Sequence, residues 1–170
     1  MADTRFVRAI DALYAVLDLP APLRGEVDET HVLLAGDTQV TIALAPNGRA
    51  AIVSAPVGHL PGTDPLRAEK GRTLLKASLA LMRSNAAAIV FDGPPAADGS
   101  RAVRASARAS LEEDSLVAGE RLKLAIEDVL DLVEIHTPTL SGGSQTIPLA
   151  NPRAAADTAA AGAETLIFRP

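Results

Sequence analysis

An Asn-Gly dipeptide between two apolar runs is the feature that most constrains the fold of this chain. Asn47-Gly48 separates an alternating segment, residues 38–45, from an apolar segment, residues 50–56. Both turn residues tolerate positive φ, so the pair favours a tight type I′ hairpin turn. A second turn at Gly36-Asp37 follows the apolar run 31–34. The sequence therefore predicts an antiparallel meander of three or four strands.

Apolar residues recur at helical spacing in three other segments, 6–17, 66–85 and 116–135. A spacing of three and four residues places them on one side of a helix, which can then pack on a core. Thr137-Pro138 is expected to end the last helix, because proline cannot continue the hydrogen-bond ladder. Three helices are therefore predicted, one before the meander and two after it.

The remaining segments complete the expected order. Residues 87–92 and 101–111 are predicted to be strands joined by a long turn, residues 24–28 a short strand, and residues 57–64 a Gly/Pro loop. This order predicts an α+β fold, an antiparallel β-sheet packed with three α-helices (α-β-β-β-α-β-β-α).

Length and composition indicate one folded domain followed by a tail. Of the 170 residues, 48% are hydrophobic but only 2% are aromatic, so the core is expected to consist of Leu, Ile, Val and Ala. We expect the domain to occupy residues 1–138. Residues 139–170 are rich in Gly, Ser, Pro and Ala, a composition typical of a flexible tail.

Charge and cysteine content narrow the classes of partner. The net charge of −5 and the few aromatic rings disfavour nucleic-acid binding, which needs a basic footprint and stacking surfaces. There is no Cys, and no apolar run approaches the ~20 residues that span a bilayer. We expect a cytoplasmic protein without membrane insertion.

Catalytic and metal-binding patterns are missing from the sequence. His31, His59 and His136 have no second histidine or carboxylate at ligand spacing, and no serine stands in a nucleophile elbow. Glu112-Glu113-Asp114 is explained by its place at a helix start, where acidic residues are favoured. We therefore predict no catalytic, cofactor or metal site, and a protein that is not an enzyme.

Three arginines mark the strand at 101–111. Alternation puts Arg104 and Arg108 on one face and Arg101 on the other. They either contact an acidic segment of a partner or keep an edge strand solvated and unpaired. We favour the second interpretation.

Two apolar segments exceed what one buried face can hold. Val32-Leu33-Leu34 puts large side chains on both sides of a strand, so either both faces are covered or one offers apolar surface to a partner. The helix around Leu74-Leu75 and Leu79 has leucines on more than one side, so it faces either a well-covered core or both the sheet and a second subunit.

Size, acidity and element order resemble the small chaperones of bacterial type III secretion, the effector-dedicated, Tir-chaperone-like class I family. The likeness covers residues 3–137. It is carried by the first helix with its short meander, by the leucine-rich helix 74–85 that ends in Asn before the strand 89–92, and by the acid-started last helix.

The resemblance implies a homodimer formed through Leu75, Leu79 and Met82. It also implies that an extended N-terminal segment of a secreted effector binds along the first helix and the strands. The implied contact residues are Phe6, Leu13, Leu17, Val32, Leu34 and Ile42. Such a chaperone keeps the effector soluble and presents it to the secretion apparatus, without a cofactor.

Two other classes of protein remain open from the sequence. The first is a protein-binding adaptor of the same fold that has no link to secretion. The second is a small enzyme whose site is assembled from scattered residues such as His31, His59 and Asp92, which requires these side chains to converge in one pocket.

Overall fold

The computed structural model describes residues 3–22, 30–62, 65, 67–81 and 86–140. Within them the elements are α1 (Thr4–Val16), β1 (Thr30–Ala35), β2 (Thr38–Leu44), β3 (Ala50–Leu60), α2 (Arg67–Leu81), β4 (Ala88–Asp92), β5 (Arg101–Ser110) and α3 (Ser115–Leu140). This order confirms the predicted α+β fold class. The predicted strand at 24–28 and the chain after Leu140 lie outside the described residues.

The five strands form one antiparallel sheet in the order β1-β2-β3-β5-β4. β5 therefore lies between β3 and β4, and the edges are β1 and β4. The interpretation of residues 101–111 as a solvated edge strand is wrong. The physical reason lies in the inward side chains of β5, Val103 and alternate alanines, which are small and buried and let the strand pack in the middle of the sheet.

The hairpin at Asn47-Gly48 is confirmed, but its loop is longer than a two-residue turn. Ala45 and Ala50 close the loop through a 2.8 Å hydrogen bond from the Ala45 amide to the Ala50 carbonyl. The Gly48 amide donates to the Ala45 carbonyl at 2.8 Å, and Gly48 has a φ of 66°. The type I′ turn is wrong because Pro46 has its φ fixed near −65°, which suits the second position of a type I turn.

β3 is longer than the sequence predicted. The expected Gly/Pro loop at 57–64 is wrong for its first four residues, because β3 continues to Leu60, which lies opposite Arg101 in β5. A shift of register between Pro56 and Gly58 accommodates the extra residue. Pairing with β5 satisfies backbone groups of these residues, which in a loop would need other hydrogen-bond partners.

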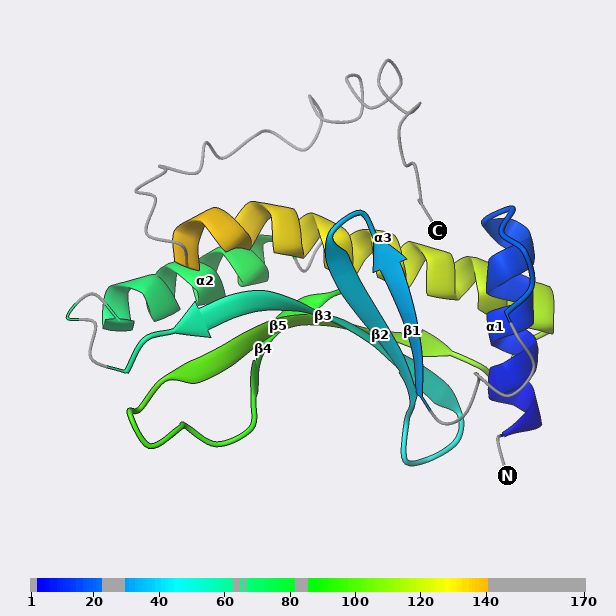
Figure 1. The fold of residues 1–170 in the computed structure, drawn as a ribbon, viewed down its shortest axis with the longest axis horizontal. Helices are drawn as coiled ribbons and strands as arrows, with labels where there is room; N and C mark the ends of the chain where they lie inside the picture. The colour runs from blue at the N-terminus through cyan, green and yellow to red at the C-terminus, as the bar shows by residue number, and fades with distance from the viewer. Residues whose placement is uncertain (1–2, 23–29, 63–64, 66, 82–85, 141–170) are drawn as a thin grey trace, which may run out of the picture.

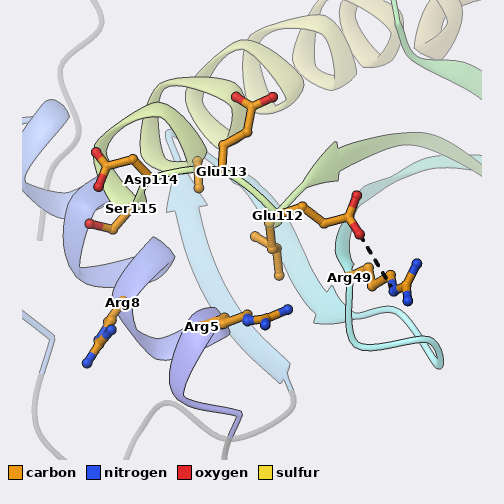
Figure 2. Close-up of a pocket in the computed structure, with 9 residues that line it drawn as sticks. Arg5, Arg8, Arg49, Glu112, Glu113, Asp114 and Ser115 are labelled. Carbon is orange, nitrogen blue, oxygen red and sulfur yellow. Dashed lines mark ion pairs between the residues drawn. The ribbon is translucent and has the colours of Figure 1, made fainter.

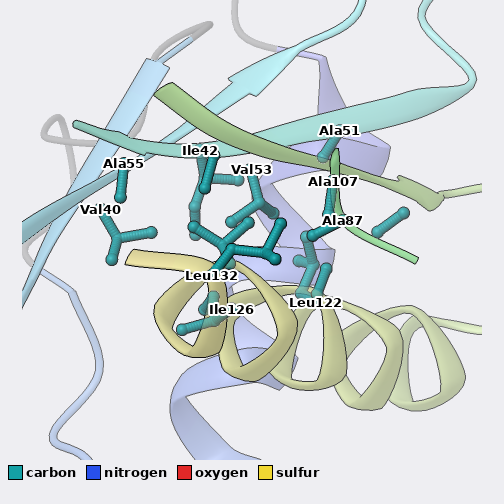
Figure 3. Packing of buried hydrophobic residues seen from close by; sticks show 14 of the residues in the cluster. Val40, Ile42, Ala51, Val53, Ala55, Ala87, Ala107, Leu122, Ile126 and Leu132 are labelled. Carbon is teal, nitrogen blue, oxygen red and sulfur yellow. The ribbon is translucent and has the colours of Figure 1, made fainter. Parts of the chain in front are cut away.

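The helices cover one face of the sheet. Figure 1 shows α2 and α3 on the same side of the sheet, with α1 at the end of α3. α3 packs on β3 and β5, and α1 packs on α3. Figure 3 shows the resulting core, in which Val53 and Ala107 of the sheet lie above Leu122 and Ile126 of α3. A Cβ on Gly119 would lie 2.8 Å from the carbonyl carbon of Ala12, so only glycine permits this approach of α1 and α3.

The last helix does not end at Thr137-Pro138, as the sequence predicted. α3 continues through Pro138 to Leu140. A proline in the last turn removes a single backbone donor, and tertiary packing offsets that loss here. Leu140 is buried, and its side chain lies over the backbone of Gly58 in β3, where a Cβ would come within 3.1 Å. The helix α3 therefore extends two residues past Pro138.

Candidate partner-binding surface

The face of the sheet that the helices leave uncovered exposes large apolar side chains. On β1, the edge strand, Val32 is 46% and Leu34 59% exposed, and Ile52 of β3 and Val90 of β4 are each more than a third exposed. These residues alternate along their strands with buried ones. An apolar sheet face of this kind is typical of a binding surface. We call it the open face, with Val32, Leu34, Ile52 and Val90 as its apolar members.

Cross-strand register places polar residues between these apolar members. Val32 lies opposite Thr41, Thr41 opposite Ser54, and Ser54 opposite Ser106. Hydroxyl groups thus form a row from β2 to β5, with Val32 of β1 at one end. Leu34, Ile52 and Val90 lie beside this row on β1, β3 and β4, which suits a partner that crosses the strands or follows one of them.

The residues predicted to contact an effector divide into two groups. Phe6, Leu13 and Ile42 are 0% exposed, so they belong to the core and offer no surface in this structure. Leu17 is partly buried against the same core. Val32 and Leu34 face outward, whereas Leu33 between them is buried. Of the two possibilities for this apolar run, the described residues have the one in which one face of the strand is left open.

His31, the buried neighbour of Val32, has a structural role. Its Nε2 lies 2.9 Å from the Tyr14 hydroxyl, and the two rings meet edge to face. This contact fastens the edge strand β1 to α1. It therefore fixes which side chains of β1 point to the open face.

The scattered residues of the enzyme alternative do not converge. His31 points into the core, while His59 and Asp92 lie on either side of Ala102 in the cross-strand register. Two strand spacings, about 10 Å, separate the backbones of His59 and Asp92. Within the described residues no group of three or more His, Asp or Glu side chains is arranged to hold a metal ion.

The arginines of β5 lie as the alternation predicted. The Arg104 guanidinium donates from Nη2 to the Ser54 hydroxyl at 3.0 Å, and its Nη1 lies 3.8 Å from Asp92 Oδ2. Arg108 is exposed on the same face, opposite Ile52. Arg101 extends over the ring of Phe91, at 5.0 Å from the ring centroid. The open face is therefore both apolar and basic.

α2 carries a second exposed apolar stripe. Leu74 and Ser78 face inward, and the Ser78 hydroxyl accepts a 3.1 Å hydrogen bond from the Ile89 amide of β4. Leu75 and Leu79, four residues apart, are 47% and 66% exposed. Met82, the third residue of the predicted dimer contact, lies outside the described residues. None of the described helices has the length and apolarity needed to cross a membrane.

Sequence reasoning missed a charged corner where α1, the β2–β3 hairpin and α3 meet. A hollow of about 570 Å³ lies there, lined by Arg5 and Arg8 of α1, by Arg49 and by the start of α3 (Figure 2). A second hollow of about 460 Å³ adjoins it and shares Arg49 and Glu112. These arginines come from segments far apart in the sequence, so no local sequence pattern predicts that they lie together.

Comparison with models of protein families finds no match, and comparison with curated proteins finds none either. Comparison with solved structures does find the fold. A chain of the crystal structure of the ExsC–ExsE complex is 19% identical, with a TM-score of 0.53, and the match covers 82% of this chain and 97% of that one. A chain of the HopA1–SchA chaperone–effector complex is 13% identical, with the same TM-score, and the match covers 79% and 96%. This chain therefore has a fold that occurs in a chaperone–effector complex.

Proposed function

We propose that this protein is a dimeric cytoplasmic chaperone of type III secretion, which binds the N-terminal segment of a secreted effector and keeps it soluble. The observation that carries the proposal is the apolar open face, on a fold shared with a chain of a chaperone–effector complex. An extended segment can place alternate side chains against Val32, Leu34, Ile52 and Val90. Binding of this kind needs no cofactor and no catalytic residue.

The edge strand β1 is the part of the open face best suited to this role. One of its sides pairs with β2, and as an edge strand it has no second neighbour in the sheet of the described residues. An unpaired edge accepts an added strand through main-chain hydrogen bonds, while the side chains beside it select the sequence. Val32 and Leu34 are those side chains here.

The exposed leucines of α2 support the dimer. Leu75 and Leu79 form one apolar stripe on a helix whose other side is already packed. A second copy that presents the same stripe would cover both, in a two-fold contact. A Leu79→Asp variant is expected to elute as a monomer in light scattering. Leu116→Asp is the matched control, because Leu116 of α3 is also well exposed but lies outside the stripe.

The experiment that tests the proposal is co-expression with N-terminal segments of proteins that the source organism secretes. We expect one such segment to become soluble and to co-purify with two copies of this chain. The double variant Val32→Asp/Leu34→Asp should lose the complex. Leu124→Asp should retain it, because Leu124 of α3 is 58% exposed, close to the 59% of Leu34, but lies away from the open face.

A monomeric chain that captures no such segment would refute the proposal. A dimer that binds only proteins that are not secreted would favour an adaptor of the same fold. Retention of the complex by the Val32→Asp/Leu34→Asp variant would place the effector elsewhere on the surface.

A further inference from the structure

Five arginines gather at one corner of a chain whose net charge is −5. Arg5, Arg8 and Arg49 line the first hollow, and Arg49, Arg108 and Arg121 line the second. We call these five residues the basic corner. They come from α1, from the β2–β3 hairpin, from β5 and from α3, so the fold alone brings them together.

The charges of the basic corner are only partly neutralised. The hollows contain three acidic residues, Glu112, Glu113 and Asp114. Arg49 Nε lies 3.6 Å from Glu112 Oε1, and Arg121 Nη2 lies 2.6 Å from Glu113 Oε1. Within the described residues no acidic side chain forms an ion pair with Arg5, Arg8 or Arg108.

The pair that joins the two hollows is a weak one. The side chains of Arg49 and Glu112 are 70% and 55% exposed. An exposed pair with this separation contributes little to stability, because water and salt screen it. Arg49 is therefore free to exchange Glu112 for a carboxylate of a partner at small cost. Figure 2 shows Arg5 across the hollow from this pair.

Arg108 connects the basic corner to the open face. It lies in the register position opposite Ile52, one of the apolar members of that face, and it also lines the second hollow. A segment that crosses the open face can therefore continue into the basic corner without a break. The surface changes along this path from apolar to cationic.

We propose that the basic corner binds a run of acidic residues next to the apolar stretch that occupies the open face, so that the partner segment is apolar at one end and acidic at the other. This proposal rests on the proposed function and specifies the chemistry of the bound segment. The carboxylates would lie between Arg5, Arg49 and Arg108, where guanidinium groups from three elements offer paired donors.

An acidic peptide fits the corner better than a nucleic acid. Bases need aromatic platforms to stack on, and no Phe, Tyr or Trp lines either hollow. The acidic remainder of the chain would repel a long polyanion but not a short carboxylate run confined to the corner.

The test uses two synthetic fluorescein-labelled peptides with the same alternating Val/Thr half. One continues in Asp and Glu, and the other continues in Lys. Fluorescence anisotropy at ~50 mM and ~500 mM salt measures their affinities, because screening within about 10 Å separates charge contacts from apolar ones. A labelled oligouridylate is the third probe.

We expect the acidic peptide to bind at least about tenfold more tightly than the basic one at low salt, with a smaller ratio at high salt. The Arg49→Glu/Arg108→Glu variant should lose this preference. Lys76→Glu/Lys123→Glu makes the same change of net charge on α2 and α3, outside both hollows, and should keep it.

Four results with these probes would overturn the inference. They are equal affinity for the two peptides, no binding of either, the same loss in the Lys76→Glu/Lys123→Glu variant, or oligouridylate binding as tight as that of the acidic peptide. The co-expressed effector segment separates the two proposals. If it still binds the Arg49→Glu/Arg108→Glu variant with unchanged affinity, this inference fails and the chaperone function stands. If no secreted segment binds the unmodified chain, the chaperone function fails.

Discussion

The two faces of the sheet differ although the same strands build both. Along β3, Ala51, Val53 and Ala55 point to α3 and are fully buried, while Ile52 and Ser54 between them point outward. Along β3 and β5 the covered face uses mainly alanine and valine, because α3 must approach these strands closely. The open face keeps larger apolar side chains and arginines because nothing in the described chain packs on it. A binding surface of this kind is recognised by large apolar side chains that stay exposed on the face that no described helix covers.

The difference between the two faces is tested most directly by truncating one side chain on each face. Ile42→Ala on the covered face should lower the free energy of unfolding by about 2–5 kcal/mol, because it leaves a cavity under α3. Leu34→Ala on the open face should change it by less than ~0.5 kcal/mol. Urea unfolding followed by circular dichroism measures both. Similar losses for the two variants would mean that the open face is covered in the isolated protein.

A smaller effect tests how α1 is attached to the covered layer. Gly119→Ala places a Cβ 2.8 Å from the Ala12 backbone, so α1 must move away from α3. We expect a loss of about 1–3 kcal/mol from overpacking. Gly71→Ala in α2 is the control, since its Cβ would meet nothing closer than 4.0 Å, and it should be neutral or stabilising. Equal changes in the thermal unfolding temperature of the two variants would contradict the α1–α3 contact.

The hydrogen bond between Tyr14 and His31 offers a finer test of what holds β1 in place. Tyr14→Phe removes the hydroxyl that lies 2.9 Å from His31 Nε2. Its loss should cost about 0.5–1.5 kcal/mol and should raise amide hydrogen exchange in β1 more than in β5. Uniform exchange rates across the sheet would show that β1 does not depend on this contact.

The effect of His136 on stability is visible only in acid. The side chain is 0% exposed, and neither ring nitrogen has a hydrogen-bond partner among the described residues. Burial therefore lowers the pKa of His136 below its ordinary value. The unfolded chain then binds the extra proton first, so stability is complete above the ordinary pKa of about 6.5 and falls as the pH drops below it.

The loss from His136 cannot exceed ~1.4 kcal/mol for each pH unit, since a single proton is involved. Thermal unfolding at a series of pH values, with His136→Leu beside the unmodified chain, measures it. We expect the variant to lose less stability than the unmodified chain between about pH 6.5 and pH 5. Parallel pH profiles for the two proteins would assign the acid sensitivity to other groups.

Local patterns predicted most of the elements but not all of their ends. The order of helices and strands, the hairpin at Asn47-Gly48 and the shared face of Arg104 and Arg108 all follow from spacing and turn chemistry. The predictions failed at Val57–Leu60 and at Pro138 for a common reason. Glycine and proline usually interrupt an element, but here β3 and α3 continue through them. In each case a distant partner packs against the segment, β5 in the first and β3 in the second.

The candidate site was accessible to sequence reasoning only in part. The run Val32-Leu33-Leu34 indicated that one face was uncovered or that both were covered, but periodicity does not distinguish the two. Phe6, Leu13 and Ile42 have the same apolar character as Val32 and Leu34, yet they are buried in the core. The basic corner had no sequence signal, because its arginines are spread over four elements.

The sequence by itself determined which side chains share a face of each helix and strand, because that depends on periodicity within one element. It also determined the turns at Gly36-Asp37 and Asn47-Gly48. The tertiary structure alone decided that β5 enters between β3 and β4, that α3 covers one face of the sheet, and that arginines from α1, β5 and α3 meet at one corner. These outcomes depend on contacts between residues far apart in the chain, and such contacts form through packing that no local spacing records.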